Sequence, residues 1–202
     1  MVSKYFTGDA PFVAGSLTGL RSFLINPVSP VSPVSRLTGV YVQDAWQPGW
    51  NTARCAALQR RTEMINRHSI PPVESKLLLA MYPEIAAHRI AAKECECGFY
   101  AYHAGNVEDE SPFPPYAALY AKAVIEGAGL ATVGTRGFRC EKARIVAVTL
   151  VRGLALLQWA NFPGWAAVTR QLKDHYPDVT FYSSTTDMRN AHPLSPPPGV
   201  TP

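Results

Sequence analysis

The pattern of apolar and polar positions along the chain predicts more strands than helices. Several short segments alternate apolar and polar residues or carry an aromatic run, which is typical of half-buried strands. The predicted strands span residues 17–23, 37–43, 99–103, 120–128, 130–134, 139–150 and 179–183. A glycine turn is expected to join residues 120–128 to residues 130–134, and Glu141-Lys142-Ala143-Arg144 could alternatively open a helix.

The clearest helical pattern lies near the C-terminus. Its apolar positions recur at steps of three and four residues and are Trp165, Val168, Leu172 and Tyr176. Pro177 is expected to end this helix. A second helix is predicted over residues 52–67, with Asn51 as its N-cap. A third is predicted over residues 73–92, broken or kinked at Pro83 because proline cannot donate to the preceding turn.

Three segments rich in proline or acidic residues are expected to be loops or tails. The threefold Pro-Val-Ser run at 27–35 favours an extended polyproline conformation, and 106–115 is an acidic, proline-rich loop. Residues 193–202 are predicted to form a disordered tail. Because the strands do not alternate regularly with the helices, the sequence predicts α+β. We expect a single compact domain over residues 1–192, with a mostly antiparallel sheet and two or three helices.

The composition limits the class of protein without naming an activity. The chain has 202 residues, of which 47% are hydrophobic and 17% charged, and this balance is typical of a soluble globular protein. The formal net charge of +4 is a mild bias, which neither indicates nor excludes a nucleic-acid partner. The sequence shows neither a signal-peptide pattern nor an apolar run of 18 residues. It therefore predicts a cytoplasmic protein that does not cross a membrane.

The candidate metal ligands are three of the four cysteines and one histidine. They are Cys55, His88, Cys95 and Cys97, and the last two form Cys-X-Cys before Gly98. Three thiolates and an imidazole suit a closed tetrahedral Zn²⁺ site with a structural role. His103 and Cys140 are alternative fourth ligands. Two other interpretations stay open, namely that the cysteines are small buried hydrophobic residues or that one of them is reactive.

A second candidate site is the basic segment at 134–144. Its cations are Arg136, Arg139, Lys142 and Arg144. With two glycines nearby, they could present N–H groups and guanidiniums to a phosphate, and Phe138 or Tyr100 could stack on a base. The alternative is an ordinary strand-turn-strand with a solvated charged face. The sequence contains neither Gly-X-Ser-X-Gly nor His-Glu-X-X-His, so no catalytic set is indicated.

Several short motifs, in this order along the chain, match a pattern found in other proteins. The matching residues are Leu17-Thr18-Gly19-Leu20-Arg21-Ser22-Phe23, Trp46, Pro48-Gly49, Cys55, His88, Cys95, Cys97-Gly98-Phe99-Tyr100-Ala101-Tyr102 and Gly134-Thr135-Arg136-Gly137-Phe138-Arg139. Through them the chain resembles a group of mycobacteriophage and actinobacterial proteins. Cys-X-Cys alternates with Cys-X-His in that group, as a zinc site permits. The chain departs from the pattern at Cys140, where a small residue is expected, and at His88, which has no neighbouring proline.

The resemblance implies a phage or phage-derived gene product and implies no reaction. The leading hypothesis is a non-enzymatic phage accessory protein, stabilised by zinc, that binds a host or phage macromolecule in the bacterial cytosol. The second hypothesis is a nucleic-acid-binding protein that uses the basic segment. The third is a metal-dependent enzyme of unknown reaction, in which one coordination position would be held by water.

Overall fold

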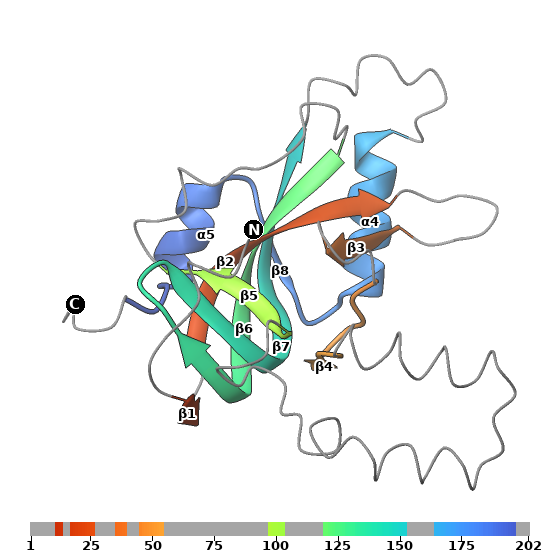
Figure 1. The fold of residues 1–202 in the computed structure, drawn as a ribbon. Coiled ribbons are helices and arrows are strands. Elements are labelled where there is room, and N and C mark those ends of the chain that lie inside the picture. The colour runs from red at the N-terminus through yellow and green to blue at the C-terminus, as the bar shows by residue number, and fades with distance from the viewer. Residues whose placement is uncertain are drawn as a thin grey trace, which may run out of the picture.

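The computed structural model describes residues 11–13, 17–26, 35–39, 45–54, 97–103, 119–152 and 164–196. Within these residues the protein is α+β, with a mostly antiparallel sheet and two helices (Figure 1). The strands are β1 (Pro11–Val13), β2 (Leu17–Asn26), β3 (Arg36–Gly39), β4 (Asn51–Thr52), β5 (Phe99–Tyr102), β6 (Leu119–Val133), β7 (Gly137–Arg152) and β8 (Thr180–Tyr182), and the helices are α4 (Trp165–His175) and α5 (Thr185–Ala191).

Four strands close on one another to form a small ring. The long antiparallel hairpin β6–β7 forms half of the ring, and the other two strands pair with it: β2 with β6, and β5 with β7. The single pair Leu20↔Tyr102 joins β2 to β5 and completes the ring. The other strands add to its margins, and of these β8 runs parallel to β7 whereas β1, β3 and β4 are antiparallel to their partners.

The inside of the ring is narrow and is filled by the aromatic side chain of Phe138. That side chain is fully buried between two glycines on neighbouring strands. A Cβ atom added at Gly19 would lie 2.6 Å from Phe138 Cε1, and one added at Gly127 would lie 2.7 Å from Cε2. Ala101, also fully buried, approaches the same place from β5. Small residues on three strands therefore make room for one large one on the fourth.

The two helices pack on opposite faces of the sheet (Figure 1). Val168 and Leu172 of α4, followed by Tyr176, join the large apolar cluster that contains Phe23 and Phe138. Met188 of α5 joins a smaller cluster instead, together with Leu20, Val124 and Ala147. Alternate residues of β2 thus face different helices, as the twofold repeat of a strand requires.

Side-chain hydrogen bonds cap the start of α5 and anchor the end of α4. Ser184 accepts a hydrogen bond from Asp187 N at 3.0 Å and so caps the start of α5. After α4, the Tyr176 hydroxyl donates to Trp46 O at 2.8 Å and accepts from Leu37 N at 3.1 Å. One buried hydroxyl therefore satisfies two backbone groups and ties the end of α4 to the turn before β4.

Most of the predicted strands and the C-terminal helix are confirmed, two local predictions are wrong, and one short helix was not predicted. Residues 119–133 form one strand, because Gly129 with φ +77° is absorbed in a bulge and does not make a turn. Asn51 and Thr52 belong to β4, so no helix begins there. The short helix α5 was not predicted, because its seven residues carry only one buried apolar side chain, Met188.

Several predicted segments lie outside the described residues. They are residues 27–34 of the Pro-Val-Ser run, residues 40–43 of the predicted strand 37–43, residues 55–67 and 73–92 of the predicted helices, the loop 106–115 and residues 197–202. The first part of the predicted tail is described and contacts β2. Ser195 N donates to Thr18 O at 2.9 Å, Thr18 N donates to Ser195 Oγ at 2.9 Å, and Leu194 packs against the smaller apolar cluster.

We expect Gly127→Ala to lower the free energy of unfolding by about 1–3 kcal/mol, because the new methyl group overpacks the interior of the four-stranded ring. Its Cβ would lie 2.7 Å from Phe138 Cε2 and 2.8 Å from Cys140 Sγ. Urea denaturation at fixed pH measures the change. Cys140→Ala should destabilise the wild type but recover part of the loss in Gly127→Ala, and this change of sign identifies the steric cause. Wild-type stability of Gly127→Ala would contradict the packing described above.

Candidate functional site

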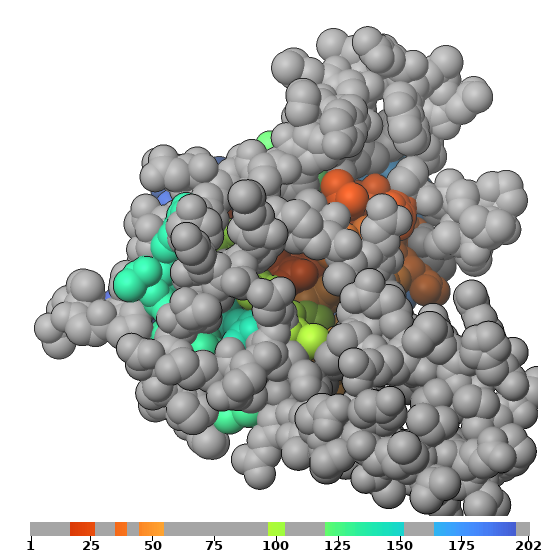
Figure 2. Space-filling model, viewed as in Figure 1, coloured from red at the N-terminus to blue at the C-terminus, as the bar shows by residue number. Residues whose placement is uncertain are grey.

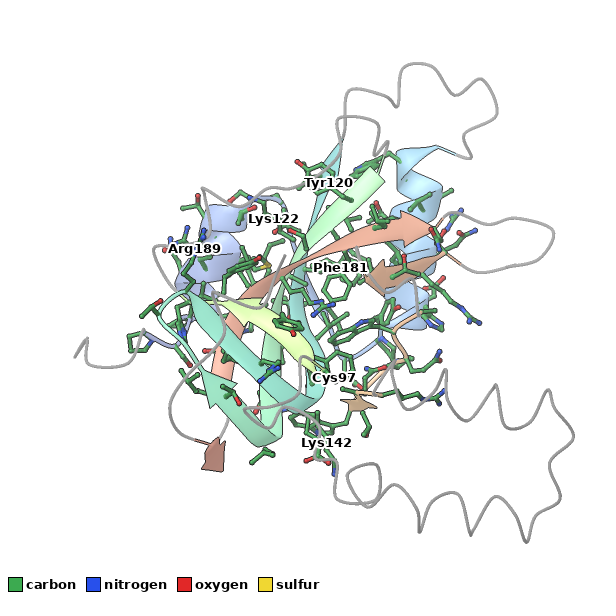
Figure 3. The ribbon with its side chains drawn as sticks, viewed as in Figure 1. Cys97, Tyr120, Lys122, Lys142, Phe181 and Arg189 are labelled. Carbon is green, nitrogen blue, oxygen red and sulfur yellow. The ribbon has the colours of Figure 1, made fainter. Side chains whose placement is uncertain are left out.

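Of the four predicted zinc ligands, Cys97 lies within the described residues. It is half-buried just before β5 (Figure 3). Gly98 follows it with φ +131°, a conformation that a side chain would rarely adopt. Cys55, His88 and Cys95 lie outside the described residues, and among the described ones no three His, Cys, Asp or Glu side chains are grouped to hold a metal. The zinc site therefore stays a prediction that rests on the chemistry of its donors.

The two alternative fourth ligands are engaged in other interactions. Cys140 is fully buried, and its thiol donates to Phe99 O at 3.6 Å. Burial raises the pKa of this thiol to about 12, so it is a protonated, apolar side chain at neutral pH. His103 is also fully buried, and backbone carbonyls face both of its ring nitrogens. Neither side chain is placed to bind zinc in this arrangement.

His103 connects three segments that are far apart in the sequence. Its Nδ1 lies 3.0 Å from Ser195 O, and its Nε2 lies 3.1 Å from Gly134 O in the turn between β6 and β7. Its backbone N–H donates to Arg136 O in the same turn at 3.0 Å. A neutral imidazole carries one N–H, so only one of the two carbonyls can accept from it at a time. Burial lowers the pKa of His103 although both hydrogen bonds act to raise it.

The four basic residues of the segment 134–144 do not form one surface. Arg139 is buried with 4% of its surface exposed, and the proposed stacking residue Phe138 is fully buried. Arg136 is half-buried in the β6–β7 turn, a region that reaches the molecular surface in Figure 2. Lys142 and Arg144 are exposed farther along β7, beside β4. The predicted phosphate site is therefore divided between a turn, a buried position and an exposed strand.

Lys142 and Arg144, two of the predicted phosphate ligands, lie on an exposed surface beside β4, a neighbour that the sequence did not indicate. Thr52 pairs with Lys142 and Asn51 pairs with Ala143, so neighbouring side chains of β4 and β7 share a side of the sheet. Ala53 is buried, whereas Thr52 and Arg54 on either side of it are exposed. We call this surface the β4–β7 outer face, made by Trp50, Thr52, Arg54, Lys142 and Arg144. Figure 3 shows Lys142 close to β4 at one end of the sheet.

Trp50 is the most unusual member of the β4–β7 outer face, because 45% of this large apolar side chain is exposed. The preceding turn holds its backbone. Asn51 Oδ1 accepts from Gln47 N at 2.9 Å, and Asn51 Nδ2 donates to Gln47 O at 2.9 Å and to Gly49 O at 3.1 Å. Gly49, with φ +75°, permits the tight turn at residues 46–51.

Arg144 is held against the Trp50 indole. Its Cζ lies 4.9 Å from the centre of the indole, and its Nη2 and Nε each lie 2.6 Å from Glu126 Oε2 on β6. An exposed cation–π contact contributes about 0.5–1 kcal/mol, and an exposed ion pair contributes about 0–1 kcal/mol. Neither interaction explains why the indole is left in water. Together they fix the orientation of an aromatic and cationic pair at the surface.

A second arginine lies on the inner side of the sheet. Arg21 Nη1 donates to Tyr100 O at 2.9 Å, and its Cζ lies 5.4 Å from the centre of the Trp46 ring and 5.6 Å from that of Phe23. Burial lowers its pKa to about 10, so it remains charged at neutral pH. Trp46 packs in turn on Phe23 and Phe99. This layer of aromatic rings ties β2, β5 and the turn before β4 together.

Comparison with protein-family models, with curated proteins and with solved structures found no match. Within the residues that the structure describes, no helix is long and apolar enough to cross a membrane.

Removal of zinc tests the predicted metal site. We expect one Zn²⁺ per chain by elemental analysis of the purified protein and none in the double variant Cys95→Ser/Cys97→Ser, because thiolates are the main donors. The double variant should also unfold at lower temperature, since metal binding contributes to folding. Cys140→Ala is the matched control and should keep its zinc, because the buried thiol contacts Phe99 O. An absence of metal in the wild type would return the cysteines to an apolar role.

The lowered pKa of His103 predicts a dependence of stability on pH. Its ordinary value is 6.5, and the folded protein binds this proton less well than the unfolded chain does. The free energy of unfolding should therefore fall as the pH drops below about 6.5. We expect urea denaturation at several pH values from about 7.5 to about 4.5, a range that spans that value, to test this. The free energy of unfolding should depend less on pH in His103→Gln than in the wild type. His175, whose pKa burial also lowers, requires the parallel variant His175→Gln. Equal slopes in wild type and His103→Gln would show that His103 does not titrate differently in the two states.

Proposed function

We propose that the protein is a non-enzymatic accessory protein of phage origin, which binds a host or phage macromolecule in the bacterial cytosol through the β4–β7 outer face. The observation that carries the proposal is the exposed indole of Trp50, held in place by its turn and contacted by Arg144. The resemblance to mycobacteriophage and actinobacterial proteins supports the origin and the compartment. A structural zinc, if bound, would stabilise the domain that presents this surface.

The energetics of Trp50 favour a binding role. Covering the exposed 45% of an indole would contribute about 2–3 kcal/mol from apolar burial alone. Tryptophan and arginine are also the residues that contribute most often to the affinity of interfaces. Trp50 is the large hydrophobic residue that the described part of the chain leaves exposed. Its backbone is already ordered by Asn51, so binding would cost little additional entropy there.

The buried ionisable groups favour a structural role over catalysis. Arg21 donates to a backbone carbonyl, and two carbonyls face the ring nitrogens of His103. The raised pKa of the Cys140 thiol makes it a poor nucleophile, because the thiolate is the reactive form. These side chains hold strands and turns together, and their polar atoms are directed at the backbone of the protein itself.

Photocrosslinking at position 50 tests the proposed function. A chain with p-benzoylphenylalanine in place of Trp50 should form a discrete covalent adduct when irradiated in the bacterial cytosol. The matched control carries the crosslinker at Thr180, an exposed position on β8. Adding Arg144→Ala should weaken the adduct at position 50, because Arg144 is an exposed cation of the same β4–β7 outer face. Digestion of the adduct with nuclease identifies the class of partner: a nucleic-acid adduct is shortened to the size of the labelled chain, whereas a protein adduct keeps its size. Equal labelling from positions 50 and 180 would contradict a binding role for this face.

A further inference from the structure

The charges of the β4–β7 outer face follow from the pairing of its strands. Thr52 of β4 is exposed and pairs with Lys142 of β7, and Trp50 and Arg54, which flank the strand, are exposed as well, as is Arg144. Glu126, opposite Arg144 on β6, adds one carboxylate. The surface thus combines three cations, one anion, one hydroxyl and one indole. This ratio of charges favours an anionic ligand.

The cations differ in what they can contact. The carboxylate of Glu126 neutralises Arg144 and holds its guanidinium on the indole, so Arg144 acts as a positioning residue for the ring. Lys142 lies opposite Thr52, and Arg54 follows two residues later on the same side of the chain. Both side chains are exposed, and both can reach a ligand that lies along β4. The result is an ordered aromatic platform with cations at one side of it.

We infer that the β4–β7 outer face binds single-stranded nucleic acid, with a base stacked on Trp50 and backbone phosphates on Lys142 and Arg54. This inference rests on the proposed function and names the class of its partner. Stacking requires that a base expose its flat surface, which a single strand does and a continuous duplex does not. The sequence suggested phosphate binding at Arg136, Arg139, Lys142 and Arg144, and the structure places the last two, which are exposed, beside Trp50.

The composition of the face favours nucleic acid over a protein partner. A stable protein interface has an apolar core surrounded by a polar rim. Here one indole is flanked by charged and polar side chains, without a second exposed large hydrophobic residue in the described part of the chain. Interfaces with nucleic acids are more polar and more positively charged. Sequence-independent binding through stacking and phosphate contacts requires no base-specific hydrogen bonds.

Fluorescence anisotropy with a fluorescein-labelled oligothymidylate of roughly twenty nucleotides, a length above the span of one small binding domain, tests the inference on the full chain. We expect saturable binding at low salt that weakens as salt is raised, because phosphate contacts release counterions. Trp50→Ala should weaken binding about tenfold, whereas Trp50→Phe should retain most of it. Quenching of tryptophan emission on binding, absent in Trp50→Phe, would report the stacking directly.

Charge reversal provides the matched control. Lys142→Glu and Arg170→Glu both exchange an exposed cation for an anion, but Arg170 lies on α4. Lys142→Glu should weaken binding several times more than Arg170→Glu does. Equal effects of the two reversals, full affinity of Trp50→Ala, or no binding at low salt would overturn the inference. A nuclease-resistant adduct at position 50 would overturn it as well, while leaving the proposed function intact.

Discussion

The contact of the Phe138 ring with the backbone at Gly19 and Gly127 is the constraint on which the rest of the structure depends. Strands on both sides of the Phe138 side chain must approach it to within van der Waals distance, and a methyl group at either glycine would lie less than 3 Å from its aromatic carbons. This close approach lets a hairpin of two long strands bend over and close with β2 and β5. Closure of the four strands in turn provides the apolar cluster on which α4 packs, and it leaves the surface beside β4 exposed to solvent.

Polar groups inside the molecule reinforce this closure from several directions. The Tyr176 hydroxyl joins α4 to β3 and to Trp46, and Arg21 joins β2 to β5 through Tyr100 O. His103 links the end of β5 to the β6–β7 turn. Each of these contacts spans a long stretch of sequence and ends on a backbone carbonyl or N–H. The fold therefore depends on a few side chains that satisfy distant backbone groups as much as on apolar burial.

The sequence was sufficient where structure is local and insufficient where it is not. Alternation predicted β7, and the apolar stripe predicted α4, since each pattern is contained in one segment. The bulge at Gly129 and the strand at Asn51 depend on pairing with β7, which no local pattern encodes. Burial of Arg139 and exposure of Trp50 likewise follow from how distant strands meet. An indole next to a Pro-Gly turn was the signal available for the candidate site, together with Lys142 and Arg144 of the basic segment.

The contact between Ser195 and Thr18 has a consequence for the order in which the chain folds. Leu17 to Leu24 of β2 pair on one side with β6, and at Thr18 the opposite side is covered by Ser195. During synthesis β2 emerges first, β6 about a hundred residues later and Ser195 later still. Until then the strand presents unpaired backbone groups, the kind of edge on which aggregation begins. Vulnerability of the nascent chain should therefore be greatest before β6 emerges, and at Thr18 it persists until Ser195 arrives, so a chaperone or rapid translation would matter most in that interval.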